Sequence, residues 1–278
     1  MQLRHFILSL ALILFAASAA AQQDSGARVS SKNKFKSFFP PPVNQSSPEF
    51  RLVDSIYRKA SLFTYGLDRM VFFDAFKGYQ YLLAAGKLSN PNILTIADYG
   101  QSAKNRRLYV IDLQNAKVLY NTFVSHGKNS GTEYASDFSN SQHSNKSSPG
   151  FMVTAETYVG VAGYSLRLDG VEQGINDQVR ARNVVMHGSK FVNYERIYEK
   201  GTIGNSLGCP AIPMSDHKQV IDAIKGGSCF FIYSNEPHYK RTSAILNSDF
   251  RWPALRQIVP VQGGAPSTAG SHTPVQSK

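Results

Sequence analysis

Cysteine and tryptophan are scarce in this 278-residue sequence, which contains two cysteines and one tryptophan. Two cysteines are too few for the disulfide framework of a small secreted scaffold, and a chain of this length builds a core without such cross-links. The histidines show no paired spacing of the kind that metal ligands adopt. We therefore expect neither a metal ion nor another cofactor.

Acidic residues are also in short supply. The chain has 19 acidic and 30 basic residues, which gives a formal net charge of +11. A basic surface favours an anionic partner. The sequence lacks zinc-ligand spacing, a helix-turn-helix pattern and basic runs interleaved with aromatic residues, so we expect no nucleic-acid partner.

Apolar runs long enough to cross a membrane are missing as well. The N-terminal stretch MQLRHFILSLALILFAASAAAQQ has Arg4 before an apolar run from Phe6 to Phe15 and ends in the A-x-A pattern of Ala19–Ala21. This run is shorter than the roughly 20 residues that span a bilayer as a helix. The pattern is typical of a secretory signal peptide over residues 1–21. We therefore expect a periplasmic or secreted protein with no integral membrane segment after cleavage.

Composition divides the remaining chain into four parts. Residues 22–48 are rich in Ser, Asn, Lys and Pro and predict a flexible linker. Apolar residues at helical spacing predict a helical N-terminal region over 49–91. A mostly β domain is expected at 92–235, followed by a polar tail over 236–278 that we expect to be disordered.

Short segments rich in Val, Ile, Leu and Tyr predict the strands of the main domain. Helices are expected at 49–62, 67–85 and 215–224, so the fold class is mainly β or α+β with an N-terminal helical addition. The predicted strands are ILTIADY, RLYVIDL, KVLYNTFV, FMVTAETYV, YSLRL, NVVMH and the strand from Cys229 to Tyr233.

The two cysteines lie in different settings. Cys229 belongs to the apolar run GGSCFFIYSN, which favours a buried core thiol. Cys209 lies in GNSLGCP, a segment of small and turn-forming residues without a strand pattern. A cysteine nucleophile needs a base that favours the thiolate and N–H donors for the oxyanion.

Both requirements have candidates in the sequence. VVMHG places His187 at the end of an apolar strand, directly before Gly188. The N–H groups of Gly208 and Cys209 are candidate oxyanion donors, and Gly208 leaves room for a substrate beside the backbone. Ser206 is placed to hydrogen-bond within the loop and fix its shape.

This arrangement resembles a known family. His-Gly followed after an interval by Ser-x-Gly-Cys is similar to the catalytic signature of the YkuD-like L,D-transpeptidases. Over about residues 93–233 the chain resembles the murein L,D-transpeptidase catalytic domain branch. The segments that carry this resemblance are GCPA, RLYVIDL, VSHGKNSG, GYSLRLDG and IKGGSCFFIY. The resemblance implies a β-sandwich-type catalytic domain at 92–235.

Roles follow from the resemblance residue by residue. It implies that Cys209 is the nucleophile and His187 the base. The backbone carbonyl of Gly188 matches the group that orients the imidazole, and Gly208 and Cys209 match the oxyanion donors. Carbapenem acylation of the cysteine is implied as well.

Substrate contacts are expected at Ser206 and, in GYSLRLDG, at Tyr164 and Arg167. Two positions depart from the pattern of many members. Leu207 stands where many have His, and Ala211 where many have Arg or Asn. These departures leave the nucleophile and base in place but put recognition of donor and acceptor in doubt.

The implied reaction is acyl transfer on peptidoglycan stem tetrapeptides, with release of D-alanine and formation of a 3-3 cross-link. Water as acceptor gives an L,D-carboxypeptidase instead. A papain-like endopeptidase is disfavoured because it places Cys before His in the sequence. A non-catalytic wall-binding module with a Cys209–Cys229 disulfide remains a further alternative.

A second His-Gly pair lies upstream in VSHGK. Its histidine, His126, is followed by Lys128 where the motif needs a cysteine. A base without a nucleophile performs no chemistry. We therefore expect His126 to be a loop or supporting residue.

Overall fold

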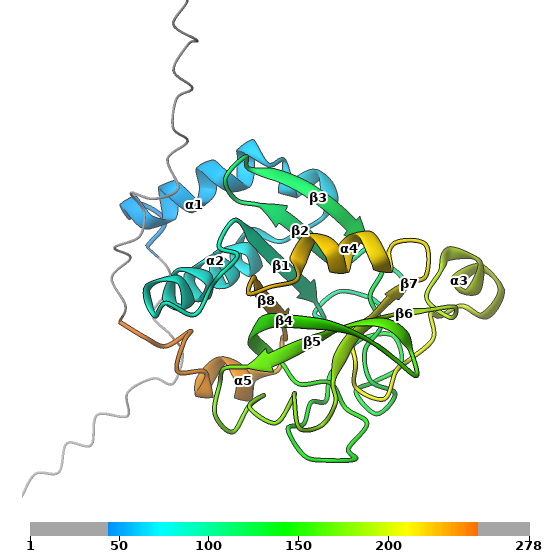
Figure 1. Ribbon diagram of the computed structural model, residues 1–278. Coiled ribbons are helices and arrows are strands. Elements are labelled where there is room, and N and C mark those ends of the chain that lie inside the picture. The colour runs from blue at the N-terminus through cyan, green and yellow to red at the C-terminus, as the bar shows by residue number, and fades with distance from the viewer. Residues whose placement is uncertain (1–43, 250–278) are drawn as a thin grey trace, which may run out of the picture. The chain divides into compact units, whose positions relative to one another are not determined.

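The computed structural model describes residues 44–249, so the predicted signal peptide and most of the predicted linker lie outside the described residues. Eight strands form one mixed sheet in the order β3-β2-β1-β8-β4-β5-β6-β7 (Figure 1). The strands are β1 (Ile93–Asp98), β2 (Leu108–Asp112), β3 (Lys117–Thr122), β4 (Gly150–Gly160), β5 (Gly163–Gly170), β6 (Val185–Ser189), β7 (Ala211–Pro213) and β8 (Cys229–Tyr233).

Helices accompany the sheet at both ends of the described chain. Ser47 caps the helix α1 (Pro48–Lys59) because its side chain accepts a hydrogen bond from the Phe50 N–H. Asp68 caps the helix α2 (Arg69–Ala84) in the same way. These caps explain where the two predicted N-terminal helices begin. The helical elements are α1 (Pro48–Lys59), the 3-10 turn η1 (Leu62–Tyr65), α2 (Arg69–Ala84), α3 (Tyr194–Lys200), α4 (His217–Ile224) and α5 (Pro237–Thr242).

One hydrophobic core lies between α1, α2 and one face of the sheet. The rings of Phe151 and Phe231 stack there with centroids 4.1 Å apart. A Cβ at position 78 would come within 2.0 Å of the Phe151 ring, so Gly78 lets α2 approach the strands. Cys229 is fully buried in this core, where burial raises the pKa of its thiol.

A second core fills the other face, which α4 covers (Figure 1). Strands β5, β6 and β7 contribute Leu166, Met186 and Ile212 to this core. Side chains alternate along a strand, so Val185 and His187 of β6 lie on the opposite face from Met186. The sheet therefore buries one face of β6 and presents the other at the candidate site. The observed mixed sheet with helices confirms the predicted α+β fold class.

The segment after β8 differs from the prediction. Residues 236–249 were expected to belong to a disordered tail, but Pro237–Thr242 form α5, and Tyr239 and Ile245 are buried in the first core. Glu236 caps this helix by accepting the N–H groups of residues 238 and 239. Two buried apolar side chains and a capped start outweigh the polar composition of the segment.

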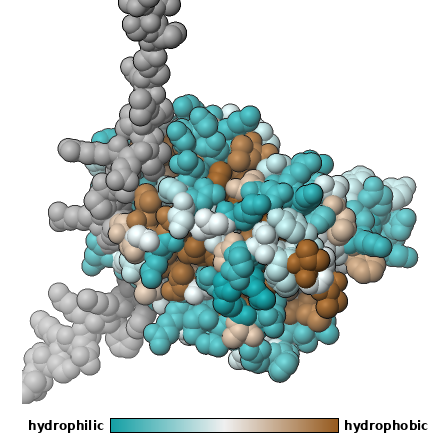
Figure 2. Space-filling model, in the orientation of Figure 1, coloured by the Kyte–Doolittle hydropathy of each residue, from teal (hydrophilic) through white to brown (hydrophobic). Residues whose placement is uncertain are grey.

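On the face seen in Figure 2, hydrophilic residues predominate and apolar residues form separate patches. Within residues 44–249 no helix has both the length and the apolar character needed to cross a membrane.

Candidate active site

Strand pairing brings the two candidate catalytic residues to the same end of the sheet. In β6, His187 pairs with Ser165 of β5 on one side and with Ala211 of β7 on the other. Cys209 precedes Ala211 by two residues, so the short strand β7 carries the cysteine to the beginning of β6. Residues 22 apart in the sequence thus become neighbours through a parallel strand pair.

The thiol of Cys209 makes two contacts with this strand and its approach. Its Sγ accepts a hydrogen bond from the Val185 N–H at 3.4 Å and lies 3.7 Å from the Asn183 carbonyl oxygen. The side chain is half-buried, and both cysteines are free. The disulfide between Cys209 and Cys229, which the non-catalytic alternative requires, is therefore not formed.

The imidazole of His187 is oriented by its own neighbour. Its Nδ1 lies 2.9 Å from the Gly188 carbonyl oxygen. The carbonyl can only accept, so Nδ1 donates and the other ring nitrogen, Nε2, is left as a proton acceptor. A Cβ at position 188 would come within 2.6 Å of Met214 Sδ and 2.8 Å of His217 Cγ, which explains a glycine there.

Ser206 shapes the turn that carries the cysteine. Its Oγ donates to the Cys209 carbonyl oxygen at 2.6 Å and accepts from the Gly208 N–H at 3.1 Å. One of the two expected oxyanion donors, the Gly208 N–H, is therefore already engaged. Within residues 44–249, the N–H groups of Leu207 and Cys209 have no acceptor, which makes them the open donors of this turn.

A long loop over residues 126–149 packs against the same turn. Gly208 adopts a φ of +123°, and a Cβ at this position would lie 2.8 Å from the Lys146 carbonyl oxygen. Ser147 Oγ donates to the Gly208 carbonyl oxygen at 3.2 Å and accepts the Gly127 N–H at 3.0 Å. Glycine at 208 thus allows both the backbone conformation and the close approach of the loop.

His126 is hydrogen-bonded through its backbone to the turn that carries Cys209. Its Nδ1 lies 2.7 Å from Arg107 Nη2, and its Nε2 lies 2.9 Å from the Gly131 carbonyl oxygen. Burial, together with the Arg107 guanidinium, lowers the pKa of His126 to about 4, so the ring is neutral. Its backbone carbonyl accepts the Ser206 N–H at 3.0 Å. This placement agrees with the prediction of a supporting residue.

Tyr164 and Arg167 of β5 lie on opposite faces of the sheet. The Tyr164 hydroxyl donates to Asp222 of α4 at 2.6 Å, on the side of the second core. Arg167 lies on the His187 side, where its Nε is 3.3 Å from Glu156 and its Nη1 is 3.5 Å from Asn183 Oδ1. The structure therefore brings Arg167 toward the cysteine and leaves Tyr164 on the far face.

One residue near the cysteine was missed in the sequence. Arg182, in the stretch QVRARN before β6, extends its guanidinium toward the turn that carries Cys209. Burial raises the pKa of the Cys209 thiol, while the Val185 N–H and the Arg182 guanidinium oppose that rise. The only sequence signal for this residue was an arginine shortly before β6, the strand that carries His187.

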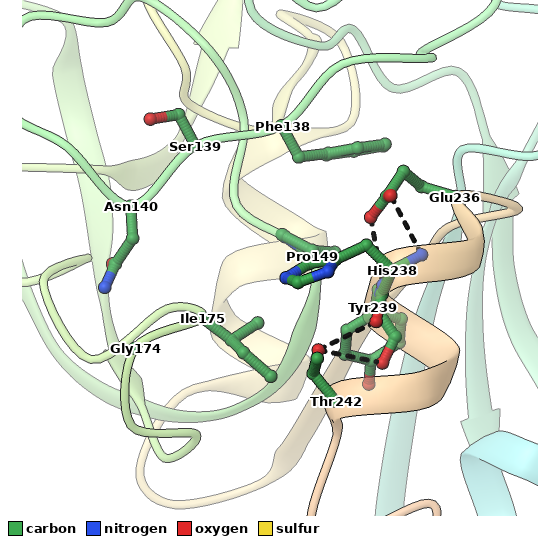
Figure 3. A pocket seen from close by; sticks show the side chains of 10 residues that line it. All are labelled: Phe138, Ser139, Asn140, Pro149, Gly174, Ile175, Glu236, His238, Tyr239 and Thr242. Carbon is green, nitrogen blue, oxygen red and sulfur yellow. Dashed lines mark hydrogen bonds between the residues drawn. The ribbon is translucent and has the colours of Figure 1, made fainter. Parts of the chain in front are cut away.

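The cavity drawn in Figure 3 is separate from this site. It lies between residues 138–140 and helix α5, and its volume is about 180 Å³. Neither Cys209 nor His187 lines it, and ligand pockets usually exceed about 300 Å³. Among residues 44–249, no group of three His, Cys, Asp or Glu side chains is arranged to hold a metal ion.

Comparison with solved structures found several L,D-transpeptidases. A protein from Mycobacterium smegmatis is 12% identical with a TM-score of 0.32, over 51% of this chain and 59% of its own. This chain therefore spans less than two thirds of that relative. A protein from Stackebrandtia nassauensis is 13% identical with a TM-score of 0.32, over 66% of this chain and 77% of its own.

Comparison with curated proteins gave no match. Comparison with protein-family models matched residues 64–233, more than half of the chain, to the L,D-transpeptidase catalytic domain. The match spans the whole β domain from β1 to β8 and includes both candidate catalytic residues. The chain therefore belongs to the L,D-transpeptidase catalytic domain family.

Proposed function

We propose that this protein is an exported cysteine acyltransferase that cross-links peptidoglycan stem tetrapeptides. The observation that carries the proposal is the placement of Cys209 at the beginning of β6, with the oriented imidazole of His187 on the same strand. Family membership supports the reaction class. The net charge of +11 suits an anionic wall polymer as substrate, and the predicted signal peptide would deliver the protein to it.

The first half-reaction forms a thioester. His187 Nε2 accepts the thiol proton, and Cys209 Sγ attacks the carbonyl carbon of the third stem residue. The oxyanion is stabilised by the open N–H groups of Leu207 and Cys209. Collapse of the tetrahedral intermediate breaks the amide bond, and the departing D-alanine amine takes the proton from His187.

The second half-reaction transfers the acyl group. The amine of a neighbouring stem gives a proton to His187 and attacks the thioester carbon, which forms a 3-3 amide bond. The thiolate leaves and regains its proton from His187, so the enzyme returns to its starting state. Water in place of the amine yields a tripeptide, which is the L,D-carboxypeptidase outcome.

Incubation with a disaccharide tetrapeptide tests this proposal, with products identified by mass spectrometry. We expect free D-alanine and a dimer whose mass equals two tetrapeptides less one alanine. A tripeptide alone would assign water as the acceptor and identify a carboxypeptidase. A tetrapeptide left unchanged by the folded protein would contradict the proposed reaction in both forms.

A further inference from the structure

Within residues 44–249, the side-chain hydrogen bonds of Arg182 all go to the loop over residues 126–149 that packs against the turn carrying Cys209. Its Nη1 donates to the Ser139 carbonyl oxygen at 2.7 Å and to Ser148 Oγ at 2.6 Å. Its Nη2 donates to Ser144 Oγ at 3.1 Å and to the Lys146 carbonyl oxygen at 2.7 Å. Four hydrogen bonds to two carbonyls and two hydroxyls fix the position of this guanidinium.

These four partners are all neutral, so the charge of Arg182 is not cancelled. Arg180, two residues earlier, differs sharply because it forms ion pairs with both Glu156 and Asp169. Within residues 44–249 no carboxylate forms an ion pair with Arg182. The structure thus holds an unpaired, half-buried positive charge at a fixed place.

That place adjoins the nucleophile. Arg182 Nη2 lies 3.6 Å from the point where a Cβ at Gly208 would stand, directly before Cys209 in the chain. The Arg182 guanidinium lowers the pKa of the Cys209 thiol, against the rise that burial causes. A positive charge within about 4–6 Å favours a thiolate in this way.

Other charged or titratable groups around the cysteine do not supply this charge. Tyr99 approaches from the end of β1, and burial raises the pKa of its hydroxyl, which keeps it neutral. Lys146 in the covering loop pairs with Asp137 at 2.5 Å. Arg167, which the fold brings toward the cysteine, pairs with Glu156 at 3.3 Å. His187 is the remaining titratable neighbour, and its proposed role is to move the proton.

We propose that Arg182 is a positioning residue whose fixed positive charge stabilises the Cys209 thiolate and whose hydrogen bonds hold residues 139–148 over the catalytic turn. The proposal rests on Cys209 being the nucleophile of the proposed function. It goes beyond that function by assigning a second, permanent source of thiolate stabilisation besides the histidine.

The test measures the rate at which iodoacetamide alkylates Cys209 as a function of pH. The thiolate displaces iodide to form a thioether, so the rate follows the thiolate fraction. In Arg182→Gln we expect the inflection of this profile to move about one unit higher than in the wild-type protein. Arg182→Lys keeps the charge but loses the fork of donors, so its inflection should stay within about half a unit while its melting temperature falls.

Arg180→Gln is the matched control, because it removes a nearby arginine whose charge is already paired. An unchanged inflection in Arg182→Gln, or an equal shift in Arg180→Gln, would overturn the proposal. If Arg182→Gln does not fold, Arg182→Lys is titrated at low salt and at about 1 M salt, where screening should raise the inflection. An inflection pH that does not change with salt concentration would then overturn the proposal.

This outcome is separable from failure of the proposed function. Iodoacetamide is small and neutral, and it reports on the thiol without any peptidoglycan substrate. A shifted profile in a protein that leaves tetrapeptide unchanged would support the role of Arg182 and reject the reaction. Peptide mapping by mass spectrometry places the adduct on Cys209 and excludes the buried Cys229 from the signal.

Discussion

Replacement of Cys209 by alanine is expected to abolish release of D-alanine from a disaccharide tetrapeptide. In the proposed reaction the sulfur forms the covalent intermediate, and no neighbouring group in the turn replaces it. Loss of a nucleophile that acts together with its base typically removes about 10⁴-fold or more of the rate. The folded state should persist, because the half-buried side chain is small and its two contacts are weak.

The second cysteine provides the control for this experiment. Cys229→Ser places a hydroxyl in the fully buried first core and should lower the free energy of unfolding by about 1–3 kcal/mol. Activity should remain in the fraction that stays folded, as measured by urea unfolding alongside turnover. Turnover by Cys209→Ala at the wild-type rate would end the assignment of the nucleophile.

Replacement of His187 by alanine is expected to lower kcat by about 10²–10⁴-fold. In the proposed mechanism the change removes both the acceptor of the thiol proton and the donor that returns a proton to the departing amine. His187 is half-buried, and within residues 44–249 its one side-chain hydrogen bond is with its neighbour Gly188, so the loss should be chemical rather than structural. Steady-state kinetics on the tetrapeptide, with circular dichroism to verify folding, measure this effect.

His126→Ala is the comparison for the second histidine. His126 is fully buried between Arg107 and Gly131, so its removal should lower thermal stability and cost less in kcat per folded molecule. Greater damage to kcat from His126→Ala than from His187→Ala would mean that the wrong histidine has been assigned as base.

Much of the candidate active site could be predicted from the sequence because its signals are local. Cys209 lies in a turn sequence, His187 ends an apolar strand, and the glycines beside them are adjacent in the chain. The opposite faces of Tyr164 and Arg167 were readable too, since residues three apart in a strand point to opposite sides. Helix α5 also has a local signal, with Pro237 at its first position after the capping Glu236.

Other features of the site depend on contacts between distant residues, which produce no periodic pattern in the sequence. The partners of Arg182 lie 34 to 43 residues upstream, in a loop without regular structure. The engagement of the Gly208 N–H by Ser206 depends on one rotamer within a turn. Sequence spacing determines neither the path of such a loop nor the direction of a hydroxyl. The open Leu207 N–H, the engaged Gly208 N–H and the position of Arg182 therefore emerged only from the fold.

Acylation by a carbapenem tests most directly whether Cys209 is the acyl-accepting nucleophile. Its strained β-lactam carbonyl is attacked by the thiolate, the ring C–N bond breaks, the freed nitrogen takes a proton, and a thioester remains. We predict a single adduct of one carbapenem per protein, mapped to Cys209 by mass spectrometry and prevented by prior thiol blocking. Cys229, which is fully buried, should stay unlabelled. The same adduct on the Cys209→Ala protein would contradict the account, because the reactive group would then lie elsewhere.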